Sequence, residues 1–195
     1  MFKSNIQYAS QAKGAIGEMY LTMRLLLLGH DVANTNFTIK NTAYYDLLCR
    51  KDGKGQAYPL QVKTSFSNTF RTGMTHADFM NDKGEYDEDM GRIRTEEKVL
   101  CPCAFVDCSG TEINPEFMIF ILTRQQTIDL ILASEYWYLT DCGKYSPHVK
   151  PTGDVGLLRI WLEGESGKAT NKHTTIFPNP LNGVSQENNW NNIWI

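Results

Sequence analysis

The sequence predicts a single α/β domain in which a mixed, mostly antiparallel sheet is flanked by helices. Three observations indicate this fold class. An apolar helical pattern comes first, two short strand patterns joined by a glycine-rich turn follow, and two apolar strand patterns then lead into a second helix. Elements in this order pack as a sheet covered by helices. A chain of 195 residues can bury such a core without a disulfide or a metal ion.

The first helix is expected over residues 9–28, with Ser10 as a candidate N-cap. Apolar residues recur at helical spacing along it, namely Ile16, Met19, Tyr20 and Met23. Gly29 follows the last leucine and is expected to end the helix, because glycine readily adopts the left-handed conformation common at helix ends. A short strand is expected at residues 37–39.

A β-hairpin is expected next, with strands at residues 44–50 and 58–63 and a turn at residues 52–55. The polar residues 64–98 include an acidic stretch, residues 78–97, which is expected to form a long loop or a weak helix. Two buried strands, a helix capped by Thr123 and an edge strand are then expected at residues 99–107, 117–122, 125–132 and 157–162.

The end of the chain has a poor core composition, because its last 25 residues hold seven of the fourteen asparagines. We therefore expect residues 1–165 to form the domain and residues 166–195 to form an arm. This arm, which contains Trp190 and Trp194, is expected to pack on the domain or on a second subunit.

Composition excludes several classes of protein. Apolar residues make up 42% and charged residues 21%, which is typical of a globular domain and not of a disordered or fibrous one. The apolar run at residues 25–28 is much shorter than the roughly 20 residues of a membrane span. The first residues lack the apolar segment of a secretion signal, so a cytoplasmic location is expected. Five cysteines, an odd number, suit free thiols there.

Neither the cysteines nor the histidines form a metal-binding pattern. A closed zinc site needs four ligands, and Cys101, Cys103 and Cys108 have no fourth at a normal spacing, so no zinc is expected. His76 follows a basic, polar stretch and is interpreted as a plain surface residue, with contact to DNA as the alternative.

The charges are unevenly distributed along the chain. Residues 1–75 carry nine basic and four acidic residues, whereas residues 76–195 carry ten and eighteen. The basic first part can face a polyanion even though the net charge of the chain is −3. The alternative is an unevenly charged surface that only contacts solvent.

Three polar residues of the hairpin are expected to share one face. With a two-residue turn at Gly53 and Lys54, the numbers of paired residues add to 107, so Asp46 lies opposite Gln61. Side chains alternate along a strand, which places Lys63 on the same face as these two. The other face is apolar and holds Leu47, Cys49, Tyr58, Leu60 and Val62. The alternative is an exposed polar face without a function.

Glu18 joins this group from the first helix, because it shares the inward-facing stripe with Leu21 and Leu25. A buried carboxylate is costly unless it has a partner. Gly14 and Gly17 remove side chains beside it and permit close approach. Carboxylate and amide oxygens suit Mg²⁺ or Mn²⁺, so Glu18, Asp46 and Gln61 are the candidate metal ligands. Lys63 would position a water molecule or stabilise charge during metal-assisted phosphodiester hydrolysis.

The order of these residues resembles the PD-(D/E)XK nuclease superfamily, which has the restriction-endonuclease-like fold. The resemblance rests on Gly17-Glu18 in the first helix, Asp46 in the hairpin and Gln61-Val62-Lys63 after the turn, and it covers residues 10–132. It implies that Glu18 and Asp46 bind a divalent metal ion and that Lys63 serves the attacking water.

This sequence departs from the family pattern at two positions. Tyr45 stands in place of the proline, which is not a ligand, and Gln61 stands in place of the second acidic residue. The predicted function is a metal-dependent DNA endonuclease of restriction, repair or mobile-element type. The alternatives are a nuclease-like protein that binds nucleic acid but cleaves weakly or not at all, and an interaction module whose polar hairpin face is incidental.

DNA is the expected partner, with another nucleic acid as the alternative. The residues expected to contact it are Lys13, Thr64, Ser65 and Arg71, although Thr64 and Ser65 could instead cap the next element. One chain carries one candidate site, so cleavage of both strands of a duplex favours a homodimer.

Overall fold

The structure is a computed structural model that describes residues 10–37, 45–110, 115–141, 153–166 and 176–195. Its main sheet has the strand order β1-β2-β3-β5-β6, and a second, two-stranded sheet pairs β4 with β7. The strands are β1 (Asp31–Asn34), β2 (Leu47–Arg50), β3 (Ala57–Ser65), β4 (Thr69–Thr75), β5 (Cys103–Gly110), β6 (Pro115–Leu122) and β7 (Asp154–Leu158). Strands β3 and β5 are parallel, whereas the other neighbours in the main sheet are antiparallel. The predicted mixed, mostly antiparallel fold class is confirmed.

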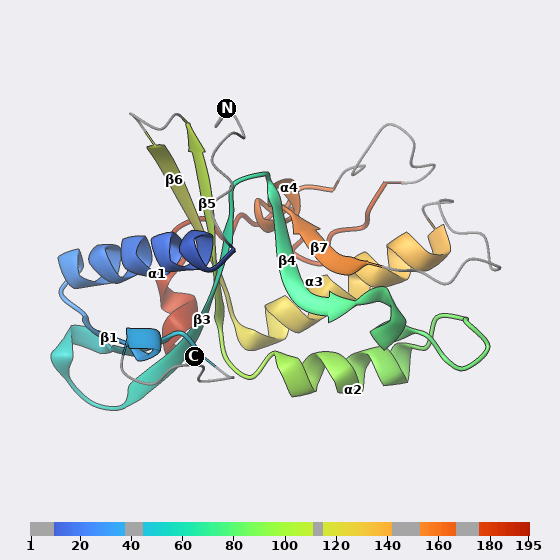
Figure 1. The fold of residues 1–195 in the computed structure, drawn as a ribbon, viewed down its shortest axis with the longest axis horizontal. Helices are drawn as coiled ribbons and strands as arrows, with labels where there is room; N and C mark the ends of the chain where they lie inside the picture. The colour runs from blue at the N-terminus through green and yellow to red at the C-terminus, as the bar shows by residue number, and fades with distance from the viewer. Residues whose placement is uncertain (1–9, 38–44, 111–114, 142–152, 167–175) are drawn as a thin grey trace.

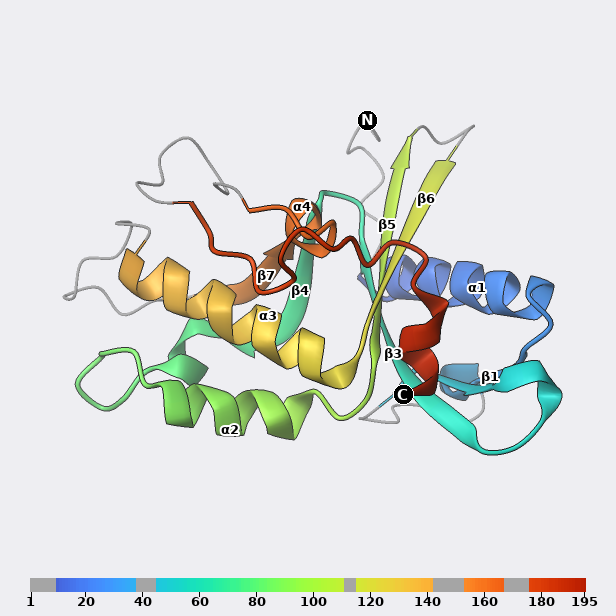
Figure 2. The ribbon, with the colours of Figure 1, turned by 180° about the vertical axis from the view of Figure 1, so that it is seen from behind.

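Helices lie on both sides of the main sheet (Figures 1 and 2). They are α1 (Ser10–Leu27), α2 (Glu88–Lys98), α3 (Arg124–Tyr136) and α4 (Arg159–Leu162). Short 3-10 or π turns occupy Thr35–Phe37, Lys51–Gly53, His76–Phe79, Trp137–Asp141 and Trp190–Trp194. Among the described residues, no helix is long and apolar enough to cross a membrane.

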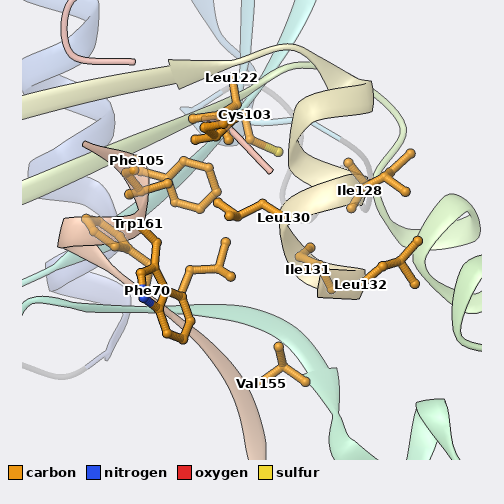
Figure 3. Packing of buried hydrophobic residues seen from close by; sticks show 14 of the residues in the cluster. Phe70, Cys103, Phe105, Leu122, Ile128, Leu130, Ile131, Leu132, Val155 and Trp161 are labelled. Carbon is orange, nitrogen blue, oxygen red and sulfur yellow. The ribbon is translucent and has the colours of Figure 1, made fainter. Parts of the chain in front are cut away.

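Two clusters of buried side chains form the core. The first lies between α1 and the main sheet and includes Leu21, Leu25, Leu47, Leu60, Val62 and Ile121. The second joins the opposite face to α3 and the small sheet. Figure 3 shows Phe105 of β5 facing Leu130 of α3, and the ring of Phe105 meets that of Phe70 edge-on at 5.4 Å. Strands β5 and β6 therefore carry buried side chains on both faces.

Helix α1 ends as its sequence predicts. Gly29 has φ +85°, and the amide of His30 donates a hydrogen bond of 3.1 Å to the carbonyl of Leu25. This is the arrangement of a helix end that glycine permits. Leu21 and Leu25 are buried against the sheet, whereas Met19 and Met23 on the outward face are exposed.

The predicted register of the hairpin is confirmed, although its turn is longer than expected. Leu47 pairs with Leu60 and Arg50 pairs with Ala57, so the numbers of each pair add to 107. The chain does not turn at Gly53 and Lys54 alone, because Lys51–Gly53 form a 3-10 turn with Asp52 in the left-handed region. The predicted apolar face is also correct, since Leu47, Cys49, Leu60 and Val62 are buried in the cluster beneath α1.

Several expected elements require correction. Strand β4, in the polar residues 64–98, was not expected. The acidic stretch 78–97, expected as a long loop or a weak helix, holds the end of a 3-10 turn, a connecting segment and helix α2. Helix α2 starts where the side chain of Asp87 accepts a hydrogen bond of 2.9 Å from the amide of Met90. The expected edge strand at 157–162 is instead the end of β7 followed by α4.

Two further boundaries differ. Strand β5 begins at Cys103, later than the expected residue 99, and α3 continues to Tyr136. The cap of α3 is as predicted, because the hydroxyl of Thr123 accepts a hydrogen bond from the amide of Gln126. Phe37, expected in a strand, ends a 3-10 turn, and residues 38 and 39 lie outside the described residues.

Residues 176–195 pack closely on the rest of the chain. Phe177 is buried against Trp161, with ring centroids 4.3 Å apart. Farther along, the segment pairs with the outer edge of β6. The amide of Ile121 donates to the carbonyl of Gln186 at 3.0 Å, and the amide of Asn188 donates to the carbonyl of Ile119 at 2.8 Å. The edge of β6 is thereby covered by the chain itself.

His76 was expected on the surface, and this interpretation is wrong. The ring is buried, its Nδ1 lies 2.6 Å from Oε2 of Glu135 in α3, and it stacks on Tyr138 with centroids 4.7 Å apart. A basic local sequence gives no sign of this pairing, because the partner is 59 positions away.

Replacement of Glu135 by glutamine should alter how stability depends on pH. Burial raises the pKa of Glu135 above its ordinary value of 4.5, although the hydrogen bond and charge of His76 lower it in part. A carboxyl group with a raised pKa in the folded state stabilises the fold fully below its ordinary pKa, and this contribution is lost as pH rises through the raised value. Glutamine stays neutral at every pH, so the variant does not lose stability in this way as the pH rises. The free energy of unfolding of the variant, relative to the natural protein, should therefore increase from pH 4 to pH 8 in urea titrations.

Glu116→Gln provides the matched control, because Glu116 is exposed on β6. Its difference from the natural protein should change much less over the same pH range. A Glu135→Gln difference that is flat, or that decreases with pH, would contradict the expected coupling.

Candidate active site

The candidate site lies where strand β2 separates from β3. Asp46 directly precedes β2, and its amide donates a hydrogen bond of 3.0 Å to the carbonyl of Leu60. Its carboxylate Oδ2 accepts a hydrogen bond of 2.7 Å from the amide of Val62. A side chain therefore takes the place of the backbone partner that a longer β2 would supply, and Asp46 is fixed against β3.

Glu18 reaches the same place from α1 because the helix lies very close to β3. A Cβ added at Gly17 would lie 1.9 Å from the hydroxyl oxygen of Thr64, so only glycine permits this approach. The closeness expected at Gly14 is not seen, since a Cβ there would have no atom within 4 Å. Gly17 is therefore the residue that sets the distance between helix and strand.

One amide group connects the two carboxylates. Nδ2 of Asn36 donates to Oε1 of Glu18 at 3.0 Å and to Oδ1 of Asp46 at 3.1 Å. Nδ2 of Asn34 donates to the other oxygen of Glu18 at 3.0 Å, and Oδ1 of Asn34 accepts from the amide of Asn36 at 2.9 Å. Glu18 and Asp46 are thus brought together, and their four carboxylate oxygens all accept hydrogen bonds.

Gln61 and Lys63 lie on the face of β3 opposite to Leu60 and Val62, as alternation requires. Oε1 of Gln61 accepts a weak hydrogen bond of 3.6 Å from the thiol of Cys103. Within the described residues, the ammonium group of Lys63 forms no hydrogen bond or ion pair. Neither side chain bonds directly to Glu18 or Asp46. Glu18 reaches Asp46 from the α1 side of β3, so the expected grouping of all four side chains on one face is not seen.

The charges of Asp46 and Lys63 influence the pKa values of two nearby thiols. The pKa of Cys101 is raised to about 11, chiefly by burial and in small part by the negative charge of Asp46, whereas a hydrogen bond with the backbone of Gln61 and the charge of Lys63 lower it. The pKa of Cys103 is raised to about 12, chiefly by burial and next by Cys101, and the charge of Lys63 again lowers it while that of Asp46 raises it. Asp46 and Lys63 therefore act on the same small region, and the thiols stay protonated and unreactive near neutral pH.

Four cysteines are free and buried, namely Cys49, Cys101, Cys103 and Cys108. Cys142 lies outside the described residues. In the part of the chain that the structure describes, no three histidine, cysteine, aspartate or glutamate side chains are grouped as a metal site. A divalent ion bound between Glu18 and Asp46 would need amide or water oxygens as its remaining ligands.

Of the four residues expected to contact nucleic acid, two have side chains that are buried or already hydrogen-bonded. The hydroxyl oxygen of Thr64 is buried against α1, and that of Ser65 bonds to the backbone of Ser67 and Thr69 in the turn before β4. Neither hydroxyl is free to meet a phosphate, and Ser65 has the capping role that was the alternative. Lys13 lies over the ring of Phe66 at 5.8 Å, and Arg71 is exposed on β4. Their contact with nucleic acid stays a prediction.

Sequence reasoning missed the two asparagines. Asn34 ends β1 and Asn36 lies in the 3-10 turn after it, in a segment where only a short strand at 37–39 was expected. Two amides two positions apart are a weak signal in a chain with fourteen asparagines. Their importance follows from the spatial position of Glu18 and Asp46.

Comparison with known proteins gives a distant structural similarity only. No protein-family model and no curated protein matches the sequence. Among solved structures, the chain is similar to a bacterial homing endonuclease, I-Ssp6803I, with a TM-score of 0.38 and 16% sequence identity. The alignment covers 63% of this chain and 74% of that one. A similarity this low does not show the function of this chain.

Proposed function

We propose that this protein is a nuclease that hydrolyses phosphodiester bonds of DNA with Mg²⁺ or Mn²⁺. The observation that supports this proposal most is the pair of carboxylates, Glu18 and Asp46, which share one amide donor. Lys63, on the other face of β3, forms no hydrogen bond or ion pair within the described residues. The resemblance to the PD-(D/E)XK superfamily is part of the same proposal.

The donor set fits a hard divalent cation. Glu18 and Asp46 supply negative oxygens, and the carbonyl oxygen of Gln61 could be added if it exchanged its weak bond from Cys103. Mg²⁺ and Mn²⁺ prefer oxygen ligands and keep several waters, so two or three protein oxygens suffice. Such an ion would lower the pKa of a bound water and neutralise charge on the phosphate.

Lys63 would act on the reacting groups and not on the ion. Water attacks phosphorus, the bond to one ester oxygen breaks, and negative charge accumulates on the phosphate oxygens. A compact ammonium group can stabilise that charge or hold the attacking water. Within the part of the chain that the structure describes, Lys63 has no hydrogen bond or ion pair to give up, which leaves its charge available for this role.

Gln61 favours the second candidate function, a nuclease-like protein that binds nucleic acid but cleaves weakly or not at all. It supplies a neutral ligand in place of a second acidic one, and its oxygen already accepts a hydrogen bond. Both functions share DNA as the partner, and a homodimer stays a prediction for both.

Substitution of Lys63 by alanine should reduce the rate of DNA cleavage about 100-fold or more and leave Mn²⁺ binding unchanged, because the lost charge acts in the transition state. Nicking of supercoiled plasmid with Mg²⁺ or Mn²⁺ measures the rate, and calorimetric titration with MnCl₂ measures binding. Lys54→Ala is the matched control, since Lys54 is exposed in the turn of the same hairpin. Equal cleavage by Lys63→Ala and the natural protein would remove Lys63 from the mechanism. Binding of DNA without any cleavage by the natural protein would favour the second candidate function.

A further inference from the structure

The side-chain amide of Asn36 lies next to both carboxylates that are the candidate metal ligands. Its Nδ2 is within hydrogen-bond distance of both Glu18 and Asp46. Two carboxylates held close together repel each other unless a donor or a cation lies between them. Lys63 forms no ion pair within the described residues, and of the donors that compensate these charges, Asn36 is the one that contacts both carboxylates.

The backbone around Asn36 is firmly attached to the segment that carries Asp46. The amide of Thr35 donates to the carbonyl of Asp46 at 3.0 Å, and the hydroxyl of Thr35 donates to the same carbonyl at 3.0 Å. The backbone amide of Asn36 donates a hydrogen bond of 2.9 Å to Oδ1 of Asn34. The backbone at Asn36 is therefore fixed, and the hydrogen bonds to Glu18 and Asp46 hold its side chain against the two carboxylates.

We propose that Asn36 is a residue of the metal site: its amide nitrogen bridges Glu18 and Asp46 without a cation, and its carbonyl oxygen becomes a ligand with one. This inference rests on the proposed function. A half-turn of the terminal amide exchanges nitrogen and oxygen at nearly the same positions, so it requires no movement of the backbone. Among the described residues, Oδ1 of Asn36 has no hydrogen-bond partner to lose.

Two substitutions at Asn36 should have opposite effects on metal binding. Asn36→Ala removes the ligand oxygen and should weaken Mn²⁺ binding about 10- to 100-fold, the range for groups that orient or support a metal site. Asn36→Asp places a third carboxylate at the site. It should lower the unfolding temperature without metal, through repulsion, and should bind Mn²⁺ more tightly than the natural protein does.

The experiment is calorimetric titration of each protein with MnCl₂ in the absence of DNA, together with thermal unfolding with and without MnCl₂. Asn34→Ala is the matched control, because the amide of Asn34 contacts Glu18 but not Asp46. It should weaken binding less than Asn36→Ala does. If Asn36 has only a structural role, both Asn36 variants unfold at lower temperature and bind Mn²⁺ as the natural protein does, and the inference is overturned.

The outcomes also separate this inference from the proposed function. If the natural protein binds no Mn²⁺, the metal site itself is refuted and the inference falls with it. If the natural protein binds Mn²⁺ and cleaves DNA, but Asn36→Ala binds the ion equally well, only the role of Asn36 is refuted. Should Asn36→Asp fail to fold without metal, the Mn²⁺ affinity of Asn36→Ala still decides the question.

Discussion

Replacement of Asp46 by asparagine is expected to lower metal-dependent cleavage of DNA by more than about 100-fold. Residues that only support metal ligands contribute about 10- to 100-fold, and Asp46 is proposed as a ligand itself. The variant should still fold, because an asparagine oxygen can accept the hydrogen bond from the amide of Val62. Plasmid nicking in Mg²⁺ and in Mn²⁺ measures the loss, and urea unfolding verifies the fold.

Asp31→Asn provides the control of identical chemistry away from the site. Asp31 lies on β1, where its carboxylate pairs with Arg50 at 2.6 Å on the surface. Its substitution should leave cleavage unchanged. Equal activity of the natural protein and Asp46→Asn would mean that the cleavage comes from a contaminant or from another site.

Substitution of Gly164 by alanine should destabilise the fold by about 2–5 kcal/mol. Gly164 has φ +83°, and a Cβ there would lie 2.6 Å from the backbone nitrogen and oxygen of Val184. The left-handed conformation costs about 1–2 kcal/mol for a residue with a side chain. Overpacking against backbone adds about 1–3 kcal/mol. Urea unfolding followed by circular dichroism measures the difference.

Gly29→Ala separates the two contributions. Gly29 has nearly the same φ, +85°, but a Cβ there would have no atom within 4 Å. Its substitution should therefore cost only the conformational part, about 1–2 kcal/mol. Equal losses for the two variants would show that the contact between Gly164 and Val184 yields on substitution and contributes little to stability.

The sequence was sufficient to predict those parts of the fold whose determinants are local. Alternation of apolar residues gave the register of the hairpin and its buried face, and Gly29 gave the end of α1. Thr123 gave the start of α3 in the same way. In each case the signal and the structure it determines lie within a few residues of each other.

The missed parts depend on partners that are distant in sequence. Strand β4 carries buried Phe70 and Met74, but it pairs with β7 more than 80 residues later, as the hydrogen bond between Thr72 and Val155 shows. His76 is buried only because Glu135 meets it. Within the candidate site, Asp46 and Gln61 could be paired from the hairpin alone. The bridge through Asn36 could not, since it depends on how α1 and β1 meet in space.

Pairing of residues 186–188 with β6 has a consequence for how the protein reaches its fold. The hydrogen-bond acceptor for the amide of Ile121 is the carbonyl of Gln186, which lies 65 positions later in the sequence. Until that late contact forms, β6 presents a row of unpaired backbone groups, and such an edge can pair with a second unfinished chain. The yield of refolding from denaturant should therefore fall as the protein concentration rises. In dilute solution residues 186–188 cover the edge of β6 before another chain meets it, whereas in concentrated solution chains aggregate first.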